Sequence, residues 1–260
     1  MSIEIIGISV IKNEDIYVEQ ALTSVIDFCD KIFVFDNYST DKTVEAVKRV
    51  KSKYPNKINI SFFKKISKTH SFVEKYAGKD KWIFGVDGDE LYDPIGLSKL
   101  RPQILNKEHQ HVWMLRGYFF HVIKINWETK IARGYLAPPS KDPNKLYNFS
   151  MLKSWKSDGV GPIFHPQTHV FKDPSFTPEK KPKKKYLTKH VKWKNCIFRC
   201  VHTRLLQRSS KERFTSKVNK RINLSNVISN KRKNPRKRYR IGRRLRKDIS
   251  GFLTLERYWQ

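Results

Sequence analysis

The sequence has few cysteines and no long hydrophobic run. Its cysteines are Cys29, Cys196 and Cys200. They are too few and too unevenly spaced for a disulfide framework, which favours a reducing compartment. No apolar run reaches the roughly 18 to 20 residues that cross a bilayer, and residues 1–4 bring no basic leader ahead of an apolar stretch. We therefore expect a cytoplasmic protein that is not secreted.

Acidic residues are scarce in the last third of the chain. Residues 179–260 hold 28 Lys and Arg against four Asp and Glu, whereas residues 1–178 hold 26 against 20. This division predicts a charge-balanced domain followed by a basic extension that is attracted to phosphates. Anionic lipid, nucleic acid and acidic glycans are the classes of partner that such a charge favours.

Strand-like and helix-like patterns alternate through the first third of the chain. Residues 4–11 form an Ile-rich apolar run, and from Val18 the apolar positions recur with the i, i+3, i+4, i+7 spacing of a helix. The same patterns predict strands at 31–35, 58–63 and 82–86, and helices from Val44 and over 71–77. Such alternation requires crossover connections and predicts an α/β fold with a mainly parallel sheet.

Acidic and amide side chains directly follow three of the predicted strands. They lie in Asn13-Glu14, at Asp36 and in Asp87-Gly88-Asp89-Glu90. Because ligands of parallel sheets bind beyond the carboxyl ends of the strands, we expect these loops to meet at one rim. Three carboxylates within four positions repel one another unless a cation lies among them, and oxygen ligands suit Mg2+ or Mn2+. A solvated acidic turn that caps a helix after Pro94 is the alternative.

Glycine-rich phosphate-binding loops are absent. Neither GxGxxG nor GxxxxGK[ST] follows the first predicted strand. We therefore expect a metal ion to hold phosphates in place of a glycine nest, and the acidic cluster predicts a metal-diphosphate site at the end of a strand.

Three segments resemble the signature segments of family 2 glycosyltransferases with the GT-A fold. They are Ile8–Glu14, Phe35–Thr43 and Val86–Glu90, in this order and spacing. The bacterial lipopolysaccharide-core glucosyltransferase type is the nearest in pattern, since its acidic motif is also an aspartate, a small residue, an aspartate and a glutamate. The resemblance implies a GT-A fold with a mainly parallel sheet flanked by helices. The charge and the apolar spacing at the end of the chain add a basic C-terminal helical extension to this expectation.

The resemblance also implies a division of the chain. A glycosyltransferase domain is expected over residues 1–208, with the nucleotide-sugar-binding half at 1–110 and the acceptor half at 111–208. The basic helical extension is expected over 209–260.

The resemblance assigns roles to residues after the first, second and fourth strands. Asp36 matches the aspartate that hydrogen-bonds the nucleotide base, commonly uracil. Asp87 matches the residue near the ribose or the metal, and Asp89 the direct metal ligand. The residues that match the loop lining the nucleotide pocket are Lys12, Asn13 and Glu14. A helix-capping Asx turn is the alternative for Asp36.

A late segment offers a candidate for a further metal ligand. Residues 196–202 alternate as a strand that ends in His202. Relatives of this type carry a histidine at the end of a late strand, and His202 is therefore implied as the third metal ligand. The serines and the lysine that follow it there are matched by Ser209, Ser210 and Lys217. A zinc site built from Cys196, Cys200, His190 and His202 is the rival, which the Cys-x3-Cys spacing on one strand disfavours.

The acceptor side needs a catalytic base. An inverting transferase uses a carboxylate to take the proton of the acceptor hydroxyl. We expect residues 112–171 to build the acceptor wall, beginning with a strand over 112–120. The candidates for the base are Glu128, Asp158, Asp173 and Glu179. Asp158 is preferred because the glycine beside it lets a loop approach the cleft.

The main interpretation is an enzyme. It is a glycosyltransferase that depends on Mn2+ or Mg2+ and moves a sugar from a nucleoside diphosphate sugar, UDP-linked, to a glycan, lipid or protein acceptor. The alternative is a nucleic-acid-binding protein carried by the basic extension. Since the extension has no motif that reads RNA or DNA, we expect no specific nucleic acid partner.

The end of the chain has an amphipathic pattern. Ile241, Leu245 and Ile249 lie four residues apart among many Lys and Arg. This pattern over 235–251 predicts a helix in peripheral contact with the inner face of an anionic membrane. A solubilising tail is the alternative.

Overall fold

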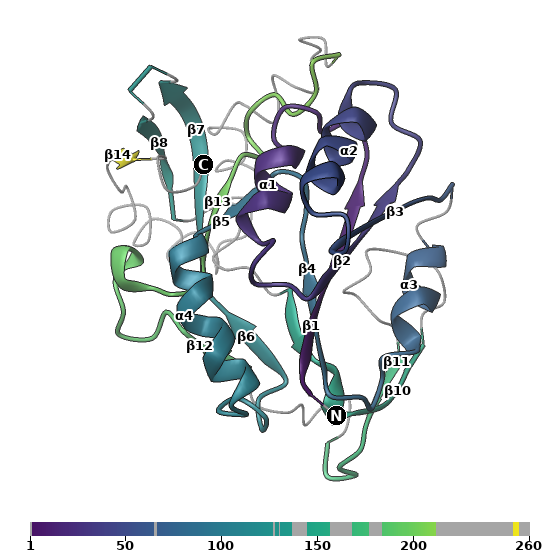
Figure 1. Ribbon diagram of the computed structural model, residues 1–260. Coiled ribbons are helices and arrows are strands. Elements are labelled where there is room, and N and C mark those ends of the chain that lie inside the picture. Colours follow the sequence, from purple (N-terminus) through teal and green to yellow (C-terminus); the bar gives the residue numbers. More distant parts are fainter. Residues whose placement is uncertain are drawn as a thin grey trace, which may run out of the picture.

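The computed structural model has one large sheet with helices on both faces and a smaller sheet beside it (Figure 1). It describes residues 2–64, 67–126, 128–129, 131–136, 145–156, 168–176, 184–211 and 252–254. The predicted helix over 235–251 lies outside these residues, as do Asp158, Glu179 and Lys217. No described helix combines the length and hydropathy needed to cross a bilayer.

The large sheet has seven strands in the order β12-β6-β9-β4-β1-β2-β3. Their bounds are β1 Glu4–Ile11, β2 Lys31–Asp36, β3 Ile58–Phe62, β4 Lys81–Gly85, β6 Met114–Arg116, β9 Leu146–Asn148 and β12 Lys184–Tyr186. The first four strands along the chain are parallel neighbours, and β9 joins antiparallel to β4 and β6. The predicted mainly parallel α/β sheet is therefore confirmed.

The helices cover both faces of this sheet. They are α1 Val18–Ser24, α2 Thr43–Lys53, α3 Ser67–Glu74 and α4 Pro94–Leu105. Successive side chains of a strand point to opposite faces, so Ile5 and Ile11 of β1 join the core under α1, α2 and α4. Ile6 and Ile8 join a second core with Val73 of α3. Because β1 is buried on both faces, its sequence is mostly apolar, with Ser9 as the polar residue in its interior.

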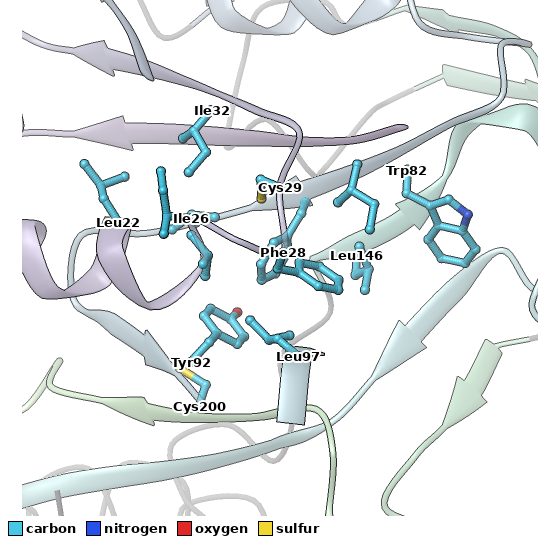
Figure 2. Close-up of a cluster of buried hydrophobic side chains, with 14 of the residues drawn as sticks. Leu22, Ile26, Phe28, Cys29, Ile32, Trp82, Tyr92, Leu97, Leu146 and Cys200 are labelled. Carbon is cyan, nitrogen blue, oxygen red and sulfur yellow. The ribbon is translucent and has the colours of Figure 1, made fainter. Parts of the chain in front are cut away.

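Figure 2 shows the first of these cores, where residues from distant parts of the chain meet. Cys29 and Cys200 lie in it as small apolar side chains, with Cys200 beside Tyr92. All three cysteines are free and buried. They contribute to packing, as expected from a sequence without a disulfide framework.

The smaller sheet has five strands in the order β14-β8-β7-β13-β5. Their bounds are β5 Glu90–Tyr92, β7 Tyr118–Asn126, β8 Ile131–Tyr135, β13 Arg199–His202 and β14 Phe252–Thr254. A separate antiparallel pair consists of β10 Leu152–Lys156 and β11 Thr168–Phe171, and the short 3-10 helices are η1 Phe149–Met151 and η2 Trp193–Asn195. A buried ion pair holds β13 against the start of α4, with Arg199 Nη2 at 2.6 Å from Asp93 Oδ2.

The structure corrects two predicted strands and one helix. The single strand expected over 112–120 is two strands in different sheets, which meet at Gly117. A Cβ on Gly117 would overlap the carbonyl of Phe198, so only glycine allows this close crossing. The strand expected over 196–202 begins only at Arg199, and the helix expected over 71–77 begins earlier, at Ser67, and ends at Glu74.

Candidate functional site

The candidate site begins where β4 ends. Val86 N donates to Ile8 O of β1 (2.9 Å), after which the acidic loop leaves the large sheet. The chain enters the small sheet at Glu90, the first residue of β5, which pairs antiparallel with β13 so that Glu90 lies opposite His202. Thr203 then donates from its backbone N (2.9 Å) and its Oγ1 (3.1 Å) to Asp89 O. Strand pairing thus brings together residues more than a hundred positions apart.

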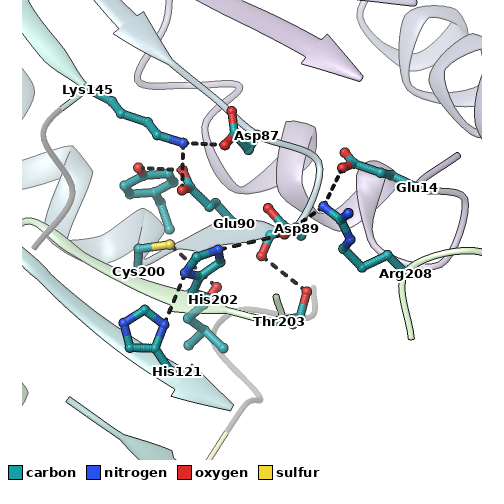
Figure 3. Close-up of polar contacts among 12 residues, drawn as sticks. Glu14, Asp87, Asp89, Glu90, His121, Lys145, Cys200, His202, Thr203 and Arg208 are labelled. Atoms are coloured by element: carbon teal, nitrogen blue, oxygen red, sulfur yellow. Dashed lines mark hydrogen bonds and ion pairs between the residues drawn. The ribbon is translucent and has the colours of Figure 1, made fainter. Parts of the chain in front are cut away.

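Three buried side chains form a possible metal site. One ligand atom from each of Asp89, Glu90 and His202 lies within 4.8 Å of the others. His202 Nε2 is 3.7 Å from Asp89 Oδ2, and His202 Nδ1 is 3.1 Å from His121 Nδ1 (Figure 3). Two carboxylates and one imidazole therefore face one another in a space the size of a coordination shell.

Two cations lie against these acids. Lys145 pairs with Asp87 and, at 2.7 Å, with Glu90 Oε1. Arg208 Nη1 is 3.1 Å from Asp89 Oδ2 and 3.0 Å from Glu14 Oε1, so it bridges the loop after β1 and the loop after β4 (Figure 3). Four carboxylates thus share two cationic side chains among the described residues.

Burial and these charges shift the pKa values of the acids. Burial raises the pKa of Glu90 to about 6, with Lys145 opposing the rise. Burial also raises the pKa of Glu14 well above its usual value, and the neighbouring charge of Asp89 adds to this rise. Burial acts in the same direction on Asp89, but His202 and Arg208 outweigh it and hold the pKa of Asp89 below its usual range. Asp89 is thus the most firmly ionised of the three.

Glu14 has unused capacity as a ligand or acceptor. Its side chain is buried, and Oε2 has no hydrogen-bond partner among the described residues. A buried carboxylate oxygen without a partner is costly. A Cβ on Gly88 would overlap this oxygen, so the glycine in the acidic loop allows Glu14 to approach. The loops after β1 and β4 therefore meet, as the sequence predicts.

The third predicted loop adjoins the first. Asp36 is fully buried, and its carboxylate accepts hydrogen bonds from Ser39 N (2.8 Å) and Ser39 Oγ (2.5 Å). Asn13 N in turn donates to Ser39 Oγ (2.9 Å), while Lys12 is exposed. The alternative of a helix-capping turn is wrong in its position, because α2 begins only at Thr43 and Lys42 is its N-cap residue.

Several predicted residues lie away from the cluster or outside the described residues. Asp158 and Glu179 are outside them. Glu128 is exposed in the turn between β7 and β8. Asp173 follows β11. Its neighbour Lys172 donates to Gly78 O, which precedes the amino end of β4, so Asp173 lies near the end of β4 opposite the acidic loop. The base is therefore not placed among the described candidates.

The rival zinc ligands are not gathered. His190 is exposed and has a positive φ of 61°. Cys196 lies before β13, where its Sγ is 3.2 Å from Phe198 O. Within the described part of the chain, the one group of three or more possible ligands is Asp89, Glu90 and His202.

Three residues of the site were not predicted as such. Lys145 lies in no segment with a helix-like or strand-like apolar pattern. Arg208 is one of the 28 Lys and Arg residues in 179–260. His121 lies just beyond the predicted strand over 112–120, and its pairing opposite His202 depends on the register of β7 with β13. Glu90 was recognised as acidic, but its place opposite His202 was not.

The residues present fit a divalent cation. Carboxylate oxygens suit Mg2+ and Mn2+, and an imidazole nitrogen is a common additional ligand of transition metals. The excess of acids over cations and the unpartnered Glu14 Oε2 are consistent with a site that holds a further positive charge.

Comparison with solved structures finds low similarity. A mannosyltransferase, PcManGT from Pyrobaculum calidifontis in complex with GDP-Man and Mn2+, is 17% identical over 44% of this chain and 35% of that chain, with a TM-score of 0.35. TarS 1-349 of S. aureus in complex with UDP is 18% identical over 59% and 50%, with a TM-score of 0.42. Glucosyl-3-phosphoglycerate synthase from Mycobacterium tuberculosis in complex with Mn2+, UDP and glucosyl-3-phosphoglycerate is 15% identical over 45% and 44%, with a TM-score of 0.32. The chain thus spans half or less of the length of these proteins.

A comparison with curated proteins gives no match. The lipopolysaccharide-core type suggested by the acidic motif stays a prediction. The family itself is shown by its model, described as glycosyl transferase family 2, which matches residues 8–214 and so most of the sequence. This chain belongs to glycosyl transferase family 2.

Proposed function

We propose that the protein transfers a sugar from a nucleoside diphosphate sugar, UDP-linked, to a hydroxyl of a saccharide, lipid-linked or other acceptor, with inversion at the sugar carbon. The observation that carries this proposal is the group formed by Asp89, Glu90 and His202 beside the carboxyl end of β4. Ligands of open parallel sheets bind at this edge.

In this proposal Asp89 and His202 hold a divalent ion, with Glu90 beside them. The ion would neutralise negative charge on the leaving diphosphate. Asp89 is suited to the task because its pKa is held below its usual range, so it is ionised at neutral pH. The imidazole favours Mn2+, because Mg2+ prefers oxygen ligands more strictly.

The nucleotide end is assigned to the loops after β1 and β2. From β4 to β2 the sheet spans two strand spacings, roughly 10 Å, which is the scale of a nucleotide lying across the strand ends. Asp36 shapes this end through Ser39 and Asn13. Direct contact between Asp36 and a base requires the loop over 37–40 to open, because Asp36 is fully buried.

The acceptor side is assigned to the part of the chain after residue 110. Asp158 stays the preferred base in this proposal, because it follows from the sequence and the described residues place no other carboxylate better. In this arrangement the metal ion binds the diphosphate. The base lies on the opposite side of the sugar and takes the proton of the acceptor hydroxyl.

The test is a thermal-shift panel of UDP- and GDP-sugars with and without Mn2+. Binding to the folded state raises the melting temperature by mass action, so a UDP-sugar together with Mn2+ is expected to give a larger rise than either alone. Asp89→Asn should abolish the joint rise and sugar transfer. The matched control is Asp27→Asn, which removes one acid whose side chain is 95% exposed. An unchanged joint rise in Asp89→Asn would refute the assigned role.

A further inference from the structure

Arg208 forms an ion pair with the Asp89 oxygen that the proposed metal would bind. Its Nη1 lies 3.1 Å from Asp89 Oδ2, and the same oxygen faces His202 Nε2 at 3.7 Å. An ion held between Asp89 and His202 would therefore stand next to the guanidinium. Two cations at one carboxylate oxygen repel each other strongly in a buried setting.

Arg208 is held in this place by the backbone around it. We call residues 203–211 the strap, because they run from Asp89 to the loops after β1 and β2. Thr203 binds Asp89 O at one end. At the other end Ser209 Oγ donates to Asp41 Oδ2 (2.5 Å), and Ser210 N donates to Asp15 Oδ1 (2.7 Å). Arg208 O also accepts from Ile16 N (3.2 Å), so the residue has little freedom to lie elsewhere.

Glu14 gives a second, independent sign of this arrangement. Arg208 satisfies Glu14 Oε1 but leaves the buried Oε2 without a partner among the described residues. A single guanidinium bridging two acids is therefore an incomplete substitute for a divalent charge. Glu14 Oε2 can therefore still accept a contact from a further positive charge, beyond the contacts that Arg208 supplies.

We propose that Arg208 is a resident counter-cation that competes with the divalent ion for Asp89. In the absence of metal it neutralises Asp89 and Glu14 and keeps the strap on the site. Binding of the ion requires the guanidinium to leave Asp89 Oδ2, so the affinity for metal alone is weakened by Arg208. This inference deepens the proposed function, because it rests on the same metal site.

The experiment measures Mn2+ binding to the full chain without nucleotide, from the loss of the electron paramagnetic resonance signal of free Mn2+. Arg208→Gln is expected to tighten Mn2+ binding at least about fivefold, the scale of a modest coupling between two ligands. Arg208→Lys keeps the positive charge and is expected to stay near the wild type. Arg204→Gln is the matched control, because Arg204 is an exposed residue of the strap and its substitution removes the same charge.

The outcomes separate the two proposals. Tighter binding in Arg208→Gln alone supports the competition. Equal or weaker binding in Arg208→Gln, with a wild type that binds Mn2+, overturns the competition and leaves the metal-dependent function standing. Equal tightening in Arg204→Gln also overturns it, because net charge then explains the effect. If no variant binds Mn2+, both the inference and the metal-dependent function fail. Should Arg208→Gln not fold, Arg208→Lys decides. Mn2+ affinity near that of the wild type supports the charge argument, because the positive charge is kept, and a tightening of fivefold or more overturns it.

Discussion

His121 is placed to orient the histidine of the candidate metal site. It lies in β7 beside His202 of β13, with the two residues in register, and both rings are buried. Their Nδ1 atoms are 3.1 Å apart, so one of them donates to the other. When His202 donates, its Nε2 carries the lone pair and faces Asp89. A partner that fixes the tautomer of a ligating histidine usually contributes to metal affinity.

We predict that His121→Phe weakens Mn2+ binding by about tenfold or more, the usual cost of losing such a partner. The substitution keeps a ring of similar size and removes the nitrogen. His121→Asn, which offers a polar atom near the position of Nδ1, should restore part of the affinity. The measurement is the same Mn2+ titration, with melting temperatures to verify folding.

His109→Phe is the control for losing a buried histidine. It removes a ring that contacts Gln103 Oε1 (3.1 Å), on α4 and away from the acids. Mn2+ affinity should stay at the wild-type value in this variant. An unchanged affinity in His121→Phe would show that the ring only fills space.

The residues of the site were predictable where their signal is local. Asp87, Asp89 and Glu90 follow an apolar run, and the structure brings them beside Glu14 as expected. Lys145 and Arg208 were not predictable, because nothing within a few residues of either one distinguishes it. Their roles come from contacts across 55 or more positions of sequence.

At the scale of elements, one of the hydrogen bonds that hold the strap joins Ser209 to Asp41. Asp41 accepts from Ser209 Oγ and from Thr43 Oγ1, each at 2.5 Å. A hydrogen bond to a charged group contributes about 1.5 to 3 kcal/mol. We predict that Ser209→Ala raises amide exchange across residues 203–211 by roughly tenfold, because 1.4 kcal/mol corresponds to that factor in an opening equilibrium. Hydrogen exchange followed by mass spectrometry checks this.

Ser98→Ala is the matched control, since Ser98 Oγ donates to Ile95 O on the exposed side of α4.

Amide exchange in the strap should also depend on pH. Burial raises the pKa of Asp41, but the hydrogen bonds of Ser209 and Thr43 outweigh it and hold the pKa below its usual 3.8. A lowered folded pKa stabilises the fold above that usual value, and this contribution is lost as the pH falls through the folded pKa. Exchange in the strap, relative to its intrinsic rate, should therefore rise below about pH 3.8. Equal amide exchange in Ser209→Ala and the wild type would show that the Ser209–Asp41 hydrogen bond does not hold the strap.

Elements with a complete local pattern were predicted well, and elements that depend on distant partners were not. The bounds of β1 match the prediction, because the strand faces a core on each side and most of its positions are therefore apolar. Residues 112–120 are equally apolar, yet the chain changes sheets at Gly117, where Phe198 O approaches. That change of sheet depends on Phe198, about eighty positions later in the chain, and the sequence around Gly117 does not predict it.

At the scale of the whole molecule, the part of the chain after the strap carries an excess of positive charge. Residues 212–260 hold 16 Lys and Arg against three Asp and Glu. Each basic residue near an anionic membrane contributes about 1 kcal/mol of attraction. We predict that the full chain binds vesicles containing phosphatidylglycerol, that binding weakens steeply with added salt, and that vesicles of phosphatidylcholine alone bind little. Vesicle flotation over a salt series is the measurement.

The location of the charge is tested by two variants with equal loss of charge. Replacing Arg243, Arg244 and Arg246 by Gln should weaken binding to anionic vesicles, because three attractive contacts are removed from one segment. Replacing Lys31, Lys48 and Lys99 by Gln removes three exposed charges elsewhere and should have a smaller effect. Equal losses would mean that net charge alone attracts the lipid. If duplex RNA displaced the protein from the vesicles and bound tightly at moderate salt, the nucleic-acid alternative would be favoured for this segment, because counterion release would then exceed the attraction to lipid.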